Sequence, residues 1–166
     1  MRKLNRGYGF TLIELAITLT VIGILSLITA FAWPNTTRWY LTLQTQQLAN
    51  DLRYMQNYAA TRHNALRINF SSSQYSFTEL DGTTAIKNPA TSASAVTLST
   101  GITLSTTNLP STYVVFDSNG IPYTNTSLAA NTALAVSAAI ILAKTGVTGT
   151  TSISPQSGAI SKPVIS

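Results

Sequence analysis

The distribution of apolar and polar residues divides the chain into three stretches. The first, Phe10 to Trp33, is apolar over 24 residues apart from a single charge at Glu14. A helix of that length rises roughly 36 Å, against about 30 Å for the hydrocarbon core of a bilayer. The nine residues before it, Met1 to Gly9, contain three basic residues and no acid. The pattern predicts a transmembrane helix with its N-terminus in the cytoplasm.

A disposable secretion signal is the alternative interpretation of this start. Such a signal has an apolar core of about 7–15 residues that ends in small residues. The run here is longer and ends in Ala32-Trp33-Pro34. A retained anchor therefore fits better, and the chain after Pro34 should lie outside the cytoplasm. Trp33, Trp39 and Tyr40 would then form an aromatic belt at the membrane interface, with packing between helices as the alternative role.

The second stretch, residues 34–63, is polar with apolar residues at steps of seven, four, three and four. Those residues are Leu41, Leu48, Leu52, Met55 and Ala59. This spacing predicts an amphipathic helix whose apolar stripe lies on a sheet formed by the rest of the chain. The alternative is a coiled coil that does not pack on a sheet. Pro34 would either kink the connection between the two helical stretches or occupy the first turn of the second one.

In the third stretch, residues 64–166, the period changes from helical to alternating. Strands are expected at 66–70, 75–77, 96–98, 102–104, 113–116, 150–153 and 159–165, with turns at 71–74, 81–82 and 117–120. Residues 133–143 fit a helix or a strand, and the branched side chains of Val136, Ile140 and Ile141 favour a strand. The predicted fold class is α+β, with a long N-terminal helix packed on an antiparallel β-sheet domain.

Glu14 is the anomaly of the apolar stretch. A carboxylate inside hydrocarbon costs several kcal/mol unless it is paired or neutralised. The apolar stretch contains no Lys, Arg or His that could pair with it, so a cation has to come from elsewhere. Cleavage between Gly9 and Phe10 would create an α-amino group with a pKa of about 8, which would supply one. The alternative is a protonated or snorkelling acid near the membrane edge.

The sequence Gly9-Phe10-Thr11-Leu12-Ile13-Glu14, after a basic leader and before an apolar stretch, resembles the class III signal of type IV prepilins and pseudopilins. The resemblance implies that a prepilin peptidase and methyltransferase cuts at Gly9/Phe10 and methylates Phe10. It also implies that Glu14 pairs with the N-terminal amine of a neighbouring subunit. Many relatives carry a kink proline where this chain has Phe31.

Neighbouring apolar helices would replace lipid around this stretch when the subunit leaves the membrane. Its small residues Gly23, Ser26 and Ala30 would allow those helices to approach closely. An unpaired Glu14 would penalise a wrong register, because an uncompensated charge there is costly.

Three further stretches resemble the minor pseudopilins of the GspH/FimT group: residues 48–59, the hairpin 66–77 and the run 115–120. The resemblance implies a pilin-like fold and a structural subunit of a type II secretion pseudopilus that supports protein export. A minor type IV pilin for pilus assembly or DNA uptake is the alternative. The implied location is the bacterial inner membrane, single-pass, with a periplasmic C-terminal domain. Expected partners are other pilins or pseudopilins, the peptidase and secreted cargo.

The residue composition argues against a catalytic or metal-binding site in the domain. The chain has no Cys and one His, His63, and it lacks the motifs of serine hydrolases and P-loop enzymes. The run 117–120 has the start of a calcium loop but not the acid that closes one, so a β-turn is the better interpretation. We therefore expect no enzyme activity, no metal and no cofactor.

Charge gives little support to a nucleic-acid partner. The net charge is +5, but the leader holds three of the positive charges, so the remainder carries +2. Some relatives place Gly-Arg-x-Arg in the C-terminal loop. The matching residues here, 158–162, contain Lys162 as their single basic residue. Phosphate contacts need Lys or Arg, so we expect no nucleic-acid binding.

Overall fold

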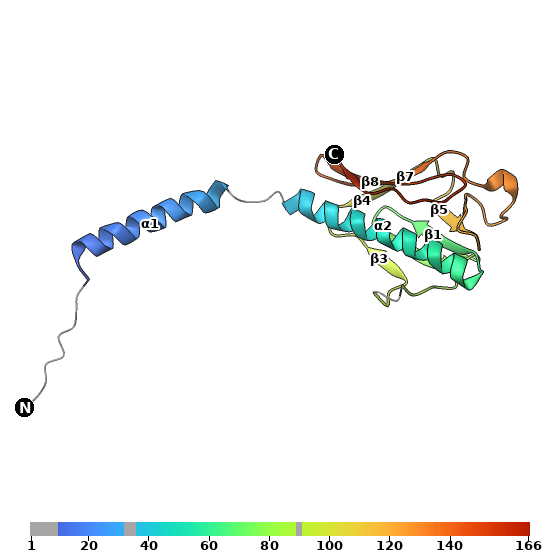
Figure 1. Cartoon of the computed structure of the whole chain (residues 1–166), viewed down its shortest axis with the longest axis horizontal. Coiled ribbons are helices and arrows are strands. Elements are labelled where there is room, and N and C mark those ends of the chain that lie inside the picture. The colour runs from blue at the N-terminus through green and yellow to red at the C-terminus, as the bar shows by residue number, and fades with distance from the viewer. Residues whose placement is uncertain (1–9, 32–35, 89–90) are drawn as a thin grey trace, which may run out of the picture. The chain divides into compact units, whose positions relative to one another are not determined.

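The computed structural model describes residues 10–31, 36–88 and 91–166. Contacts divide the chain into two compact units, Met1–Thr36 and Thr37–Ser166. The first contains helix α1, and the second contains nearly all of helix α2 and every strand (Figure 1). The elements are α1 (Leu12–Phe31), α2 (Thr36–Arg62), β1 (Leu66–Phe70), β2 (Gln74–Glu79), β3 (Ala95–Thr97), β4 (Thr103–Thr107), β5 (Tyr113–Phe116), β6 (Pro122–Tyr123), the 3-10 turn η1 (Ala130–Thr132), β7 (Ala138–Lys144), β8 (Val147–Ile153) and β9 (Val164–Ile165).

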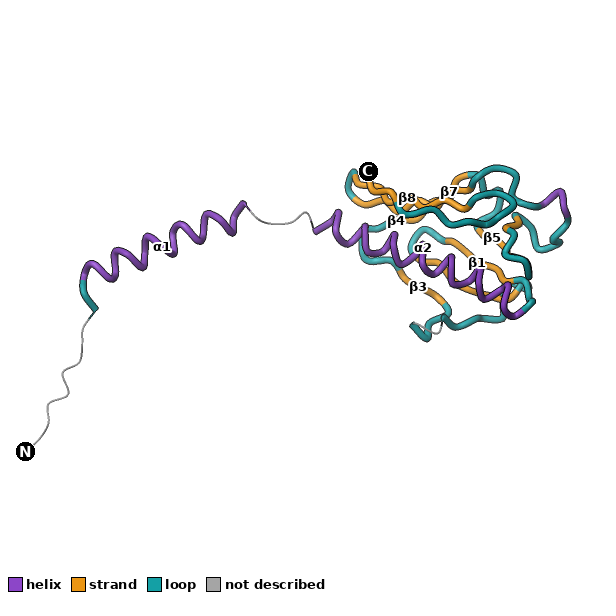
Figure 2. Tube along the Cα trace, in the orientation of Figure 1, coloured by secondary structure: helices purple, strands orange, loops and turns teal. Residues whose placement is uncertain are grey.

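Two antiparallel sheets form the second unit, where the sequence led us to expect one. The first has the strand order β3-β2-β1-β5-β6 and the second the order β4-β7-β8-β9. The strands gather in two groups beside α2 (Figure 2). Alternation along β1 places Leu66, Ile68 and Phe70 in the core, while Arg67 stacks over the ring of Tyr113 on the opposite face. An α+β fold with a long helix on antiparallel sheet is therefore confirmed.

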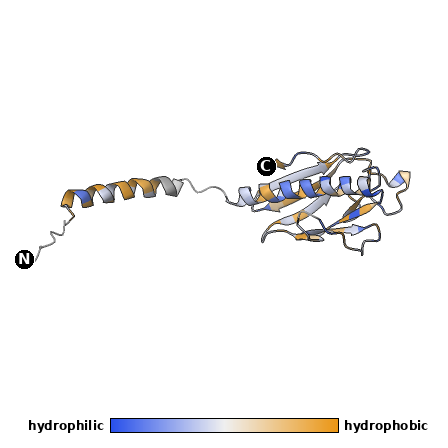
Figure 3. Cartoon of the chain, turned by 60° about the horizontal axis from the view of Figure 1, so that its bottom comes forward, coloured by the Kyte–Doolittle hydropathy of each residue, from blue (hydrophilic) through white to orange (hydrophobic). Residues whose placement is uncertain are grey.

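Helix α2 packs its apolar stripe on both sheets. The five predicted stripe residues, Leu41, Leu48, Leu52, Met55 and Ala59, are all fully buried. Figure 3 shows the hydrophilic face of the same helix turned outward. The stripe is thus covered by the sheets of its own chain, which removes the need for the coiled-coil alternative. The helix ends in a left-handed residue, His63 at φ 51°, and Asn64 N–H donates to Ala59 C=O at 3.3 Å. This is the geometry of a Schellman cap.

Close approach of α2 to the second sheet requires a glycine. Gly149 lies in β8, and a Cβ built there would fall 2.1 Å from the hydroxyl oxygen of Thr45 on α2. Thr45 is itself fully buried and donates its hydroxyl to Leu41 C=O at 2.7 Å. A side chain at 149 would therefore push the helix away from the sheet.

Several strand boundaries differ from the prediction by one to three residues, and three differences are larger. Residues 133–137 form no strand: Ala133 makes a single antiparallel bridge with Tyr123 of the first sheet, and strand β7 of the second sheet begins only at Ala138. The last strand is confined to Val164–Ile165, preceded by a single bridge between Ile153 and Ile160. The short strand β6 was not predicted, since two residues carry no periodicity.

Candidate assembly site

Helix α1 exposes apolar side chains around its whole circumference. Ten large apolar residues between Leu12 and Leu27 are each 48% exposed or more, and the helix is coloured mainly hydrophobic in Figure 3. An amphipathic surface helix would confine such residues to one stripe. A helix that is apolar all round is normally surrounded by lipid or by other helices. Among the described residues, no helix reaches the combination of length and apolar character needed to cross a membrane; Trp33, the expected end of the span, lies outside them.

Glu14 closes the N-terminus of α1 through a capping box. Thr11 precedes the helix, and its backbone N–H donates to Glu14 Oε2 at 3.0 Å while its hydroxyl donates to the same oxygen at 2.8 Å. In return, the Glu14 N–H donates to the Thr11 hydroxyl oxygen at 3.3 Å. Sequence reasoning missed this role of Thr11. The signal was present, because Thr-x-x-Glu before an apolar run is the signature of a capping box.

The capping box gives Glu14 hydrogen bonds but no positively charged partner among the described residues. Both hydrogen bonds from Thr11 fall on Oε2, so no donor within the described part of the chain reaches Oε1. The free N–H groups of the first helical turn favour a carboxylate at this position. The side chain is thus fixed in direction, with one oxygen available to an external cation.

The sequence also singled out Gly9, Phe10, Gly23, Ser26 and Ala30 in this segment. Gly9 lies outside the described residues, and Phe10 is 78% exposed. A Cβ built on Gly23 would meet no atom within 4 Å. The Ser26 hydroxyl donates to Ile22 C=O at 2.7 Å, and Ala30 lies within α1. The proposed close approach of other helices at these positions stays a prediction.

Two of the three aromatic residues expected at a membrane interface begin α2. Trp39 and Tyr40 are 60% and 49% exposed, and their rings meet edge to face at 5.7 Å. Neither is buried in the core of the domain that carries it. Trp33 lies outside the described residues, so the aromatic belt remains a prediction.

A buried polar cluster joins α2 to the first sheet. The Tyr75 hydroxyl donates to Asp51 Oδ2 at 2.7 Å, and Asn88 Nδ2 donates to Asp51 Oδ1 at 2.7 Å. Burial raises the pKa of the Asp51 carboxyl, although the two hydrogen bonds act in the opposite direction. Burial and the neighbouring carboxylate also raise the pKa of Tyr75, which keeps its hydroxyl protonated as a donor. The cluster fixes the loop after β2 against the helix.

The run 115–120, which carried part of the family resemblance, comprises the end of β5 and a turn over residues 117–120 that is held by α2. Asp117 Oδ1 accepts hydrogen bonds from the N–H groups of Asn119 and Ile121, so a plain turn is confirmed. No group of His, Asp and Glu side chains suited to a metal occurs among the described residues. Gln56 Nε2 donates to Gly120 C=O at 2.9 Å and to Ser157 C=O at 3.0 Å. This residue therefore connects the turn to the C-terminal loop.

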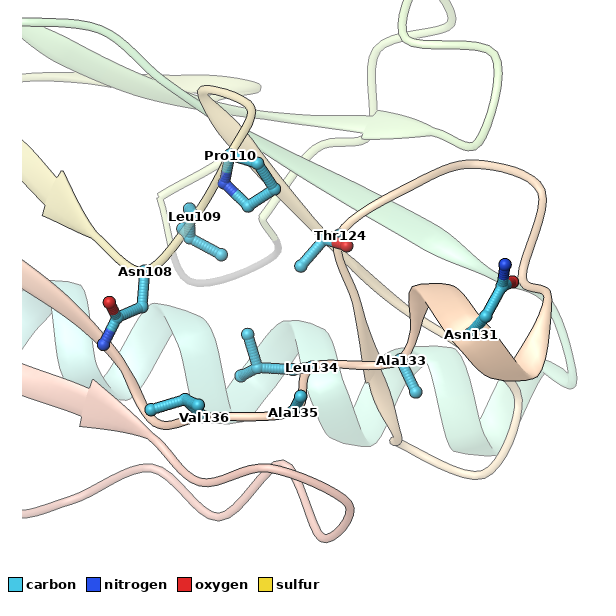
Figure 4. Close-up of a pocket in the computed structure, with 9 residues that line it drawn as sticks. All are labelled: Asn108, Leu109, Pro110, Thr124, Asn131, Ala133, Leu134, Ala135 and Val136. Atoms are coloured by element: carbon cyan, nitrogen blue, oxygen red, sulfur yellow. The ribbon is translucent and has the colours of Figure 1, made fainter.

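An open cavity is lined by loop residues of the second unit (Figure 4). Its volume is about 510 Å³, and it opens between the β4–β5 loop and the segment that precedes β7. The lining combines small apolar side chains with amides and one hydroxyl: Asn108, Leu109, Pro110, Thr124, Asn131, Ala133, Leu134, Ala135 and Val136. None of these nine residues is an acid or a base, so this lining provides no acid–base chemistry.

The fold and the exposed apolar helix define a pilin-like protein. Residues 44–152 match the family described as type II transport protein GspH, and residues 4–30 match the prokaryotic N-terminal methylation motif. The first match covers more than half of the chain, so the chain belongs to the GspH family. The second match covers the predicted cleavage site and implies processing by a prepilin peptidase.

Two solved structures share the fold. One is the minor pseudopilin EpsH from the type 2 secretion system of Vibrio cholerae, with a TM-score of 0.56 and 11% identity over 75% of this chain and 95% of that chain. The other is the type IV minor pilin FimU of Pseudomonas aeruginosa, with a TM-score of 0.54 and 17% identity over 77% of this chain and 91% of that one. No curated protein matches the sequence. The predicted resemblance to the GspH/FimT group is confirmed.

Proposed function

We propose that the protein is a minor pseudopilin, a structural subunit that joins a type II secretion pseudopilus through α1. One observation carries the proposal: the chain combines a GspH domain with a helix that exposes apolar side chains on every side. That helix has a single acid, Glu14, near its start. The domain has its own core, whereas the helix needs an apolar environment from outside the chain. A membrane before assembly and neighbouring helices after it would both provide that environment.

Processing creates the assembling form of the subunit. The peptidase cuts at Gly9/Phe10 and Phe10 is methylated, in keeping with the methylation motif over residues 4–30. The new amine lies four residues before Glu14. In the assembly, the amine of one subunit pairs with the Glu14 carboxylate of its neighbour, and the orientation imposed by Thr11 supports this pairing.

The charge pattern and the family support a location in the inner membrane before assembly. Residues 10–33 hold the subunit in the inner membrane before assembly, with Met1 to Gly9 in the cytoplasm and the domain in the periplasm. Partners are the peptidase, other pseudopilins and secreted cargo. The role is structural rather than enzymatic. A minor type IV pilin is the second candidate, supported by the fold shared with FimU.

Replacement of Gly9 by Phe tests the processing step. We expect the variant to keep its leader, because a bulky residue blocks the site at which the peptide bond is cut. Mass spectrometry of the protein extracted from membranes measures this directly, with Gly7→Phe as a matched control that should still be processed. Normal processing of the Gly9 variant would contradict the assigned cleavage site.

A pair of variants separates the two possible roles of Glu14. Thr11→Ala removes the capping hydroxyl but keeps the backbone N–H of residue 11 and the carboxylate, whereas Glu14→Leu removes both the capping box and the charge. We expect Glu14→Leu to insert into membranes normally but to be largely lost from sheared pseudopili, and Thr11→Ala to retain most of its incorporation. Equal loss in both variants would reduce Glu14 to a helix cap and remove the pairing proposal.

A further inference from the structure

A second polar pocket lies between α2 and the C-terminal loop. Its volume is about 230 Å³, and its lining consists of Gln46, Asn50, Arg53, Lys162 and Pro163. The first three residues follow one another at steps of four and three along α2, which places them on one face of the helix. The other two come from the segment between the Ile160 bridge and β9.

Arg53 is fixed in this pocket by hydrogen bonds to the chain itself. Its Nη2 donates to Ile160 C=O at 3.2 Å and to Ser161 C=O at 3.0 Å. Its Nη1 donates to Asn50 Oδ1 at 3.1 Å. A guanidinium group has five N–H donors, so further donors remain. The side chain is half-buried, and its orientation is already set before any ligand arrives.

The pocket offers donors and positive charge without an acid in its lining. Asn50 gives its oxygen to Arg53, which leaves its amide N–H groups available. Lys162 is exposed and adds a second cation. The acid nearest to Arg53 in the sequence, Asp51, is buried and bound to Tyr75 and Asn88. The two positive charges therefore meet no opposing charge within the lining.

We propose that this pocket binds a carboxylate side chain of a partner protein, which goes beyond the proposed function because it does not involve α1. A carboxylate oxygen can accept a charge-assisted hydrogen bond from an N–H group of Arg53 that the chain does not use, and Lys162 adds a second positive charge. The volume suits one acidic side chain. A nucleic acid fits less well, because stable binding to DNA uses a row of about 6–10 phosphate contacts rather than one pocket.

Titration with a short peptide tests the proposal on the full chain in non-ionic detergent. The probe is acetyl-Gly-Glu-Gly-amide, and the control is the same peptide with Gln. We expect the Glu peptide to shift the NMR amide signals of residues 50, 53 and 160–163, and the Gln peptide to leave them unchanged. Equal shifts with both peptides would overturn the proposal.

Variants locate the binding. Lys162→Met should weaken the Glu peptide by about two- to fivefold, and Lys162→Arg should restore it. Lys87→Met, which removes an equally exposed lysine from another loop, should leave binding unchanged. Equal weakening by the Lys87 and Lys162 variants would indicate non-specific charge attraction and contradict the proposal.

Arg53→Lys and two further ligands complete the test. Arg53→Lys should also weaken the peptide, with its thermal unfolding midpoint reported beside it. Inorganic phosphate and a duplex oligonucleotide are titrated in the same way. Tighter binding of either through residues 53 and 162 would assign the pocket to phosphate and overturn the carboxylate assignment.

Discussion

The two helices of this protein differ in how far their apolar side chains are buried. In α2 the apolar stripe from Leu41 to Ala59 is fully buried by the two sheets of the same chain. In α1 ten large apolar side chains remain exposed. Burial of one such side chain contributes about 1.5–3 kcal/mol, so the ten together exceed the typical stability of a whole domain, about 5–15 kcal/mol. The surface of α1 is therefore matched to an environment that the chain does not supply.

Polar side chains show the same contrast. In α1 the hydroxyls of Thr18, Thr20 and Ser26 donate to carbonyls three or four residues earlier in their own helix. Such bonds satisfy the hydroxyl donors within the helix itself, which suits a helix that faces an apolar environment. In α2 the Thr45 hydroxyl forms the same kind of bond to Leu41 C=O, but Asp51 and Gln56 also form hydrogen bonds to strands and loops far away in the sequence. The second helix is the organising element of a domain, whereas the first satisfies its hydroxyl groups internally and leaves its apolar side chains exposed.

Matched leucine truncations should give the largest contrast between the helices. Leu52→Ala in α2 opens a cavity in the core and should destabilise the domain by about 3–5 kcal/mol. Leu19→Ala in α1, where the side chain is 62% exposed, should leave the domain unchanged. Hydrogen exchange of the strand amides in detergent measures both effects. A comparable loss of strand protection in the Leu19 variant would show that α1 contributes to the core.

Two glycine substitutions should separate the energetic cost of a left-handed backbone from the cost of steric crowding inside the domain. Gly146→Ala places a side chain at φ 76° in open space and should cost about 1–2 kcal/mol from the left-handed backbone alone. Gly158→Ala adds a Cβ 2.3 Å from Gly120 C=O and should cost about 1–3 kcal/mol more through overpacking. Urea unfolding followed by the strand amides gives both values. Equal losses of stability in the two variants would mean that the loops around Gly120 and Gly158 can move apart at little energetic cost.

The smallest expected effect concerns the pH dependence caused by Asp51. Because burial raises the pKa of this carboxyl above its ordinary value of 3.8, the native domain binds the proton more tightly than the unfolded chain does. Its contribution to stability is therefore fully present below pH 3.8 and is lost as the pH rises through the folded-state pKa. In Asp51→Asn, this decline in stability with rising pH should disappear.

Unfolding measured across that pH range compares the Asn variant with the unchanged protein. Asp81 acts in the opposite direction, because hydrogen bonds from Thr84 and Thr83 lower the pKa of its carboxyl. Its contribution is present in both proteins, so the difference between their pH profiles isolates Asp51. Parallel profiles would mean that the hydrogen bonds from Tyr75 and Asn88 cancel the effect of burial.

Local patterns were sufficient to predict the elements around which the chain is built. The run of apolar residues from Phe10 predicted α1, and the steps between Leu41 and Ala59 predicted both α2 and its buried face. Short strands were less predictable, because β6 and β9 have two residues each and carry no period. The capping role of Thr11 was within reach of the sequence, since its signal spans only four residues.

The sequence by itself determined which residues are apolar, at what period, and that an acid stands alone near the start of an apolar helix. Tertiary structure decided that the strands form two sheets, that Gly149 admits Thr45, and that Arg53 meets Lys162 across a pocket. The physical reason is the range of the interactions. Hydrophobic periods and caps act within a few residues, whereas the partners of Asp51 lie 24 and 37 residues away in the chain, at distances that no local pattern encodes.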